Sequence, residues 1–195
     1  STDPLAATLD ALLQSGLRAL ADGRVDDAAA ACRRALGQAP RLPQAHFLVG
    51  LVALERRDWR TAVHAFGSVT ALEPGHAAAW AHLARAWLQS GEFEHATTAL
   101  GEAVARGSHD PFVVDLIGTV HSLLGDQPAA LAAYERACAA EPRHPAFAIN
   151  RANALVYLGR MEEAVAALSR VLATDPANPQ AHWLLANARR ATDAR

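Results

Sequence analysis

The sequence predicts an all-α fold, in which five 34-residue helical hairpins stack as a solenoid and a lone C-terminal helix follows them. The first supporting observation is an internal repeat, because residues 50–53 align with residues 118–121 at a separation of 68, or twice 34. The second is composition: Ala supplies 47 of the 195 residues, whereas only 12 are Gly and 10 are Pro, a balance that favours helices. A period of this length indicates stacked units that each bury an apolar face against their neighbours.

The repeat frame runs along the chain without insertion, since every unit starts 34 residues after the previous one. Full repeats are expected at 9–42, 43–76, 77–110, 111–144 and 145–178. A truncated sixth unit, 179–192, is expected to be a capping helix. The chain, residues 1–195, is therefore predicted to be a single array.

Glycine and proline mark the turns. Position fifteen of a repeat is Gly in four repeats and Arg57 in the second, and Gly there can adopt the positive φ that ends a helix. Position thirty-two is Pro in four repeats, where it stops the preceding helix, and Ser108 in the third, which delays its break to Pro111. Positions eight and twenty are Gly or Ala throughout, so two helix backbones can approach closely there.

These signals predict two helices in each repeat. The expected pairs are 9–22 with 25–38, 43–56 with 59–72, 77–90 with 93–106, 111–124 with 127–140, and 145–158 with 161–174. A lone helix is expected at 179–192.

Residues 77–110 carry the fullest match to a known repeat. The matching residues are Trp80, Leu83, Ala84, Trp87, Gly91, Phe93, Ala96, Leu100 and Ala103. On these residues the chain resembles the tetratricopeptide repeat family, and the resemblance covers residues 9–192 in unbroken phase. The aromatic residue usual at position four is kept only as Trp80; the other units have Leu12, His46, Val114, Ala148 and His182. The resemblance implies a right-handed α-solenoid in which the first helix of each pair lines a concave groove.

The same resemblance implies a function. The chain is expected to be a non-catalytic protein–protein interaction scaffold that binds a peptide or partner domain in its groove, without enzymatic activity and without a cofactor. A weaker resemblance, carried by residues 179–183 and 189–193, is to the repeat region of bacterial proteins with a downstream sulfotransferase domain. It gives an alternative, in which the chain is the N-terminal substrate- or partner-recruiting module of a larger bacterial transferase. The open reading frame beyond Arg195 distinguishes the two.

In this family the groove is lined mainly by positions two, five, six, nine, twelve and thirteen. In the N-terminal half these positions include an apolar set: Leu13, Leu17, Leu20, Phe47, Leu48, Leu51 and Leu54. We expect Phe47, Leu48 and Leu51 to anchor an apolar peptide or an amphipathic helix. The alternatives are that these side chains bury one another, that residues 1–8 fold back over them, or that a second copy of the chain covers them.

The C-terminal half of the predicted groove is polar. Its residues are His82, Arg85, Asp115, Thr119, Asn150, Asn153, Asn187 and Arg190. We expect His82, Arg85, Asp115, Asn150, Asn153 and Asn187 to take part in binding. An Asn side chain both donates and accepts, so it can pair with the backbone of an extended peptide, and the repeats of O-GlcNAc transferase are similar at positions six and nine. The alternative is a solvated polar face.

Other functions are disfavoured. The residues of a chaperone-binding carboxylate clamp are missing, since Leu13 and Leu17 stand where that clamp has Lys and Asn. The nine His form no metal-binding spacing, and the chain has no Gly-rich phosphate loop and no GxSxG motif. A net charge of −2 gives no electrostatic footprint for nucleic acid. No apolar run approaches the roughly 20 residues that span a bilayer.

Two remaining features bear on cellular context. Cys32 and Cys138 lie three repeats apart, so they are expected to be unbridged, buried core residues. The use of Arg without Lys, together with the high Ala content, is typical of a GC-rich bacterial genome. We expect a cytoplasmic protein, while a targeting segment removed ahead of Ser1 stays an open alternative.

Overall fold

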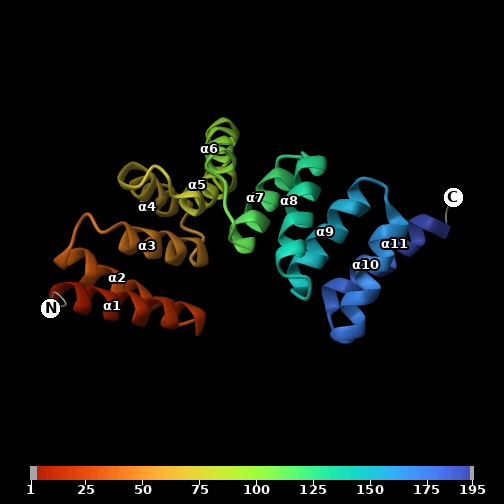
Figure 1. Cartoon of the computed structure of the whole chain (residues 1–195). Helices are drawn as coiled ribbons and strands as arrows, with labels where there is room; N and C mark the ends of the chain where they lie inside the picture. Colours follow the sequence, from red (N-terminus) through yellow and green to blue (C-terminus); the bar gives the residue numbers. More distant parts are fainter. Residues whose placement is uncertain (1–3, 194–195) are drawn as a thin grey trace. The chain divides into compact units, whose positions relative to one another are not determined.

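The computed structural model describes residues 4–193, and within that range it contains eleven α-helices and no strand (Figure 1). The first six are α1 Pro4–Ala21, α2 Val25–Gln38, α3 Pro43–Glu55, α4 Trp59–Leu72, α5 Ala77–Gln89 and α6 Phe93–Arg106. The remaining five are α7 Pro111–Leu123, α8 Gln127–Ala140, α9 Pro145–Tyr157, α10 Met161–Thr174 and α11 Pro179–Asp193. The all-α prediction is confirmed, and the second helix of every hairpin begins and ends at the predicted residues.

The chain divides into two compact units. The N-terminal unit, Ser1–Arg106, contains α1 to α6, and the C-terminal unit, Gly107–Arg195, contains α7 to α11. Within each unit every helix packs on the helix that follows it. The first helices of successive hairpins are also in contact, for example α1 with α3 and α9 with α11. Each unit is therefore a stack of helical hairpins. That all five repeats form one array stays a prediction.

The hairpin turns follow the predicted chemistry. Gly23, Gly91, Gly125 and Gly159 have φ of 74°, 85°, 87° and 75° at position fifteen. Arg57, at the same position of the second repeat, also has a positive φ of 56°. The left-handed conformation is disfavoured for residues with a Cβ. The turn geometry is thus imposed by the repeat, and Arg57 adopts it at a cost in free energy.

Small residues allow the two helices of a hairpin to approach closely. A Cβ built on Gly50 of α3 would lie 2.5 Å from Cζ of Phe66 in α4, and one on Gly118 of α7 would lie 2.8 Å from the Tyr134 ring of α8. The alanines at position twenty are all fully buried: Ala28, Ala62, Ala96, Ala130 and Ala164. Positions eight and twenty are therefore the contact points between paired helices, as predicted.

A ring nitrogen at position four ties successive repeats together. Trp80 Nε1 donates to the Pro74 carbonyl at 2.9 Å, and His46 Nε2 and His182 Nε2 lie 2.9 Å and 2.7 Å from the carbonyls of Pro40 and Pro176. Because the acceptor is a backbone carbonyl in each case, the ring nitrogen is the donor. Either Trp or His supplies this bond, which explains why position four tolerates both.

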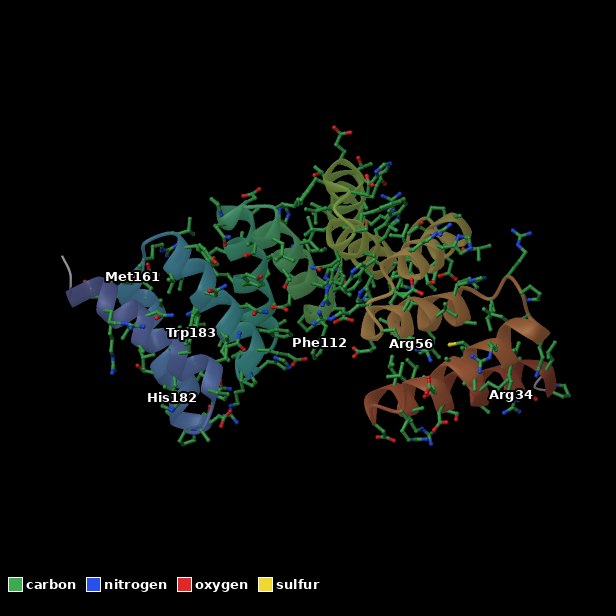
Figure 2. All side chains as sticks on the ribbon, turned by 180° about the vertical axis from the view of Figure 1, so that it is seen from behind. Arg34, Arg56, Phe112, Met161, His182 and Trp183 are labelled. Carbon is green, nitrogen blue, oxygen red and sulfur yellow. The ribbon has the colours of Figure 1, made fainter. Side chains whose placement is uncertain are left out.

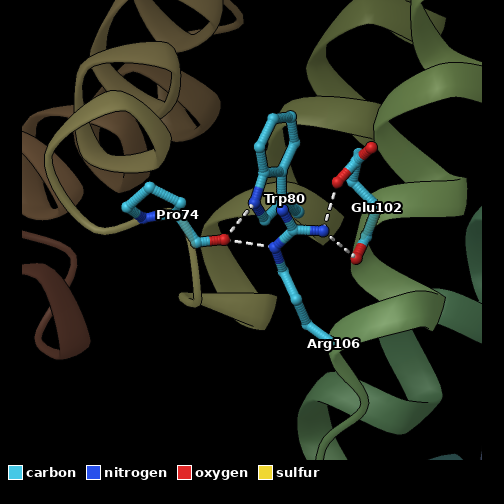
Figure 3. Close-up of polar contacts among 4 residues, drawn as sticks. All are labelled: Pro74, Trp80, Glu102 and Arg106. Atoms are coloured by element: carbon cyan, nitrogen blue, oxygen red, sulfur yellow. Dashed lines mark hydrogen bonds and ion pairs between the residues drawn. The ribbon is translucent and has the colours of Figure 1, made fainter.

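Arg106 reinforces the bond at Trp80 (Figure 3). Its guanidinium lies 5.0 Å from the Trp80 ring centroid and donates to the Pro74 carbonyl and to the Glu102 carboxylate. Trp80 and Arg106 of the third repeat thus both donate to one carbonyl of the second repeat, and Glu102 holds the Arg106 guanidinium in place.

The first helix differs from its prediction. It begins at Pro4 rather than near residue 9, because Pro at the first helical position is compatible with a helix start and residues 5–8 contain no helix breaker. Residues 4–8 therefore extend α1 and do not fold back over the apolar groove positions. Residues 1–3 lie outside the described range.

Candidate functional site

The N-terminal unit contains a hollow of about 330 Å³ between α1 and α3. It is lined by Asp10, Leu13, Gln14, Leu17, Gln44, Phe47, Leu48 and His76. Seven of these residues are at positions two, five, six or nine of their repeats, and His76 is the exception. Leu17 is 43% exposed and Phe47 is half-buried, so apolar surface is open to a ligand here.

Leu48 does not serve as the exposed anchor that we expected. It is 1% exposed and packs with Ala19, Cys32 and Val52. The reason is the small residue opposite it, since a Cβ on Gly16 would lie 2.6 Å from the Leu48 side chain. Leu48 therefore lines the hollow as a buried residue. Leu51, three residues further along α3, is half-buried.

An aromatic cluster borders the hollow. Phe47 stacks on His76 at 5.1 Å and meets Phe66 edge-on at 5.4 Å, while His82 stacks on Phe66 at 5.0 Å. Burial, followed by the nearby charges of Arg85 and His76, lowers the pKa of His82 to about 4. His82 is consequently neutral near pH 7 and packs on Phe66, and its part in binding stays a prediction.

Asn150 is already engaged by its own chain. Its side-chain amide donates to both carboxylate oxygens of Asp115, each at 3.0 Å, which links α9 to α7. Burial raises the pKa of Asp115, and the bond from Asn150 and the charge of His144 oppose this rise. The pair fixes the two first helices, and only the Asn150 carbonyl oxygen is left for a ligand.

The other predicted polar residues differ in their surroundings. Asn187 accepts a hydrogen bond from Arg190 at 2.5 Å within α11, and Asn153 is half-buried on α9. Arg85 is exposed on α5. Arg85 is thus the exposed residue among the predicted polar residues of the N-terminal unit, and Asn153 is partly accessible in the C-terminal unit.

Sequence reasoning missed three exposed aromatic residues in the C-terminal unit. Phe112 of α7, Tyr157 of α9 and Trp183 of α11 are 54%, 68% and 64% exposed. Figure 2 labels the side chains of Phe112 and Trp183. They occupy positions two, thirteen and five of their repeats, which are groove positions. The sequence could therefore have identified them, because Leu17 and Phe47 were selected by their groove positions in the same way.

Family models confirm the repeat. Models described as tetratricopeptide repeats match residues 13–59, 53–117 and 152–191. The chain belongs to the tetratricopeptide repeat family. The matches lie in both units, and the predicted repeat bounds stay a prediction. Proteins of the tetratricopeptide repeat family are in general non-catalytic interaction scaffolds.

Solved tetratricopeptide repeat structures share the fold. A thermophilic protein of this family from Thermus thermophilus has a TM-score of 0.76 at 24% identity, covering 92% of this chain and 98% of its own. YrrB, described as having an unusual peptide-binding site, has a TM-score of 0.61 at 15% identity, covering 93% and 97%. Part of the Cut9–Hcn1 assembly has a TM-score of 0.79 at 18% identity, covering 92% and 36%. These likenesses establish the fold alone.

One curated relative is similar in sequence. The TPR repeat-containing thioredoxin TTL4 of Arabidopsis thaliana is 38% identical over 97 residues, which is 50% of this chain. The match spans only 14% of that relative's length. The similarity is therefore between repeat regions.

Among residues 4–193, no group of three His, Cys, Asp or Glu side chains is placed to hold a metal ion. No helix in the same range combines the length and apolar character that a membrane crossing requires. Both thiols are free; Cys32 is buried, whereas Cys138 is half-buried rather than fully buried as predicted.

Proposed function

We propose that this protein is a non-catalytic scaffold that binds a peptide or a segment of a partner protein on its first helices. The proposal rests on the location of the exposed apolar side chains, most of which lie on first helices. Of the large apolar residues left exposed, five occupy first-helix groove positions: Leu17, Phe112, Leu123, Tyr157 and Trp183. Exposed apolar patches of this kind mark interaction surfaces.

The N-terminal unit supplies an apolar subsite. Leu17 and Phe47 flank the hollow of about 330 Å³, and Asp10, Gln14 and Gln44 supply polar groups at its wall. A bulky apolar side chain of a ligand would enter the hollow, while the polar groups pair with its backbone.

The C-terminal unit supplies aromatic contacts with polar neighbours. Trp183 and Tyr157 present large, rigid surfaces, which lose little side-chain entropy on binding. Asn153 offers a donor and an acceptor on the same helix as Tyr157. Asp115 and Asn150 position this surface by tying α7 to α9.

The test uses peptides selected from a random library against the full chain. We expect Trp183→Ala or Leu17→Ala to weaken binding of a selected peptide at least tenfold, measured by isothermal titration calorimetry. Phe93→Ala is the matched control, since Phe93 is 60% exposed but lies on the second helix α6. Binding that depends on Phe93 and survives both first-helix variants would refute the proposal.

The sulfotransferase-like alternative, a recruiting module within a larger transferase, stays a prediction. The genomic reading frame beyond Arg195 tests it directly. A catalytic domain encoded downstream would make the scaffold the recruiting part of that enzyme.

A further inference from the structure

A second hollow, of about 490 Å³, lies in the C-terminal unit on a different set of positions. Its wall combines the end of α8, the turn into α9, and parts of α9 and α10. Three arginines line it: Arg143 in the turn, Arg151 on α9 and Arg170 on α10. No acidic residue is among the lining residues. The hollow is therefore strongly cationic, although the whole chain has a net charge of −2.

Two departures from the repeat pattern produce this hollow. Position four is Ala148, so the ring that bonds to the preceding proline carbonyl in α3, α5 and α11 is missing, and both Ala148 and Pro142 line the space. Position seven is Arg151, whereas the same position is a buried Leu83, Ile117 or Leu185 in other repeats. In the fifth repeat, Ala148 thus leaves empty the space that a ring fills in α3, α5 and α11, and Arg151 places a cation where three other repeats have a buried aliphatic side chain.

The hollow also contains buried polar atoms without partners. Arg151 Nε and His144 Nδ1 are buried and have no hydrogen-bond partner within the described part of the chain. At the position of His144, His76, Asp110 and Asn178 each accept a backbone N–H at the start of the next helix, and His144 does not. Buried polar groups in native proteins are almost always paired. The two unpaired atoms could therefore hydrogen-bond to a polar group of a bound ligand.

Three acidic residues, Asp115, Glu135 and Glu163, interact electrostatically with residues that line the hollow, and two of them are hydrogen-bonded elsewhere. Glu163, whose pKa is lowered by Arg160 and to a lesser extent by Arg151, accepts two hydrogen bonds from Arg160 at 2.7 Å. Asp115, whose charge interacts with His144, accepts both bonds from Asn150. The three arginines of the hollow form no ion pair in the described residues.

We propose that this hollow binds a phosphate or sulfate group, either free or as the head of a small organic ester. A carboxylate carries one charge and is satisfied by one guanidinium fork, whereas a tetrahedral dianion can accept bonds from several arginines on different elements. Ala148, Ala167 and Val171 supply an apolar wall for the organic part. The site uses positions four and seven and the second helix α10, so it is separate from the first-helix surface of the proposed function.

The test measures thermal unfolding of the full chain at constant ionic strength with added phosphate, sulfate, phenyl phosphate, succinate or chloride. We expect a saturable rise in melting temperature with phosphate and sulfate that exceeds the response to succinate and chloride. Tenfold tighter binding of phenyl phosphate would identify an ester as the ligand, and equal affinity would identify the free anion.

Arg151→Leu restores the residue type of the other repeats. It should abolish the response to phosphate and raise the melting temperature without anion, because it removes a buried unpaired group. Arg34→Leu is the control, since Arg34 is exposed and occupies in α2 the repeat position of Arg170. Should Arg151→Leu fail to fold, Arg170→Gln gives the same reading through at least tenfold weaker binding. A wild type that does not respond, or responds equally to succinate, or a response that survives Arg151→Leu, overturns the proposal.

Discussion

Gly50→Ala is expected to destabilise the N-terminal unit although Ala is the better helix former. The new methyl carbon would lie 2.5 Å, 2.6 Å and 2.8 Å from three atoms of the Phe66 ring. The ring has little room to move, because Phe66 is fully buried and packed against His82 at 5.0 Å and Phe47 at 5.4 Å. Overpacking of this kind costs about 1–3 kcal/mol. Replacing a helical Gly by Ala returns about 0.5–1 kcal/mol, so we expect a net loss of about 1 kcal/mol and at most about 2.5 kcal/mol.

The assay is denaturant unfolding followed by far-ultraviolet circular dichroism. Gly67→Ala in α4 is the matched control, because a Cβ at Gly67 meets no atom within 4 Å. The same chemical change should therefore stabilise at residue 67 by about 0.5–1 kcal/mol and destabilise at residue 50. Equal stabilisation by both variants would refute the close approach of α3 and α4 at position eight.

Three further predictions follow from single positions. Arg57→Gly should raise the free energy of unfolding by about 1 kcal/mol, because it relieves a positive φ of 56°, and Gly91→Arg should do the reverse, both measured by denaturant titration. Burial lowers the pKa of His82 from 6.5 to about 4, so the unfolded state binds more protons between these values. Stability therefore falls as pH decreases through this window, by up to roughly 3 kcal/mol, and His82→Phe should flatten this pH dependence. Burial raises the pKa of the Cys32 thiol to about 11. Iodoacetamide at pH 8 should therefore label the half-buried Cys138 well before Cys32 in the native protein, and label both thiols in denaturant. Equal labelling rates of the two thiols in the native protein would contradict this.

Much of the fold was predictable because the repeat fixes backbone geometry at specific residues. Gly at position fifteen and Pro near position thirty-two set the helix ends, and the left-handed turn is kept even where Arg57 replaces Gly. The early start of α1 was not predicted, because the repeat frame contains no information about residues ahead of it.

The candidate site was less predictable, since side-chain exposure depends on the size of the residue opposite. Leu48 and Phe47 are adjacent in sequence and both at groove positions, yet Leu48 is buried because Gly16 leaves space for it. His82 is polar by type but is buried against Phe66, which a single position in a repeat does not reveal. Trp183 and Tyr157 were detectable from their positions alone. The cationic hollow was not, because the repeat frame does not show that Arg143, Arg151 and Arg170 line one space.

The most direct test of the central claim is site-specific photo-crosslinking to a library-selected peptide. A photoreactive amino acid is placed singly at Leu17, Asn153 or Trp183 on first helices, or at Phe93 or Arg136 on second helices. We predict crosslinks from one or more of the first-helix sites and none from the two second-helix sites, with the crosslinked residues identified by mass spectrometry. Crosslinks confined to Phe93 or Arg136 would contradict binding on the first helices.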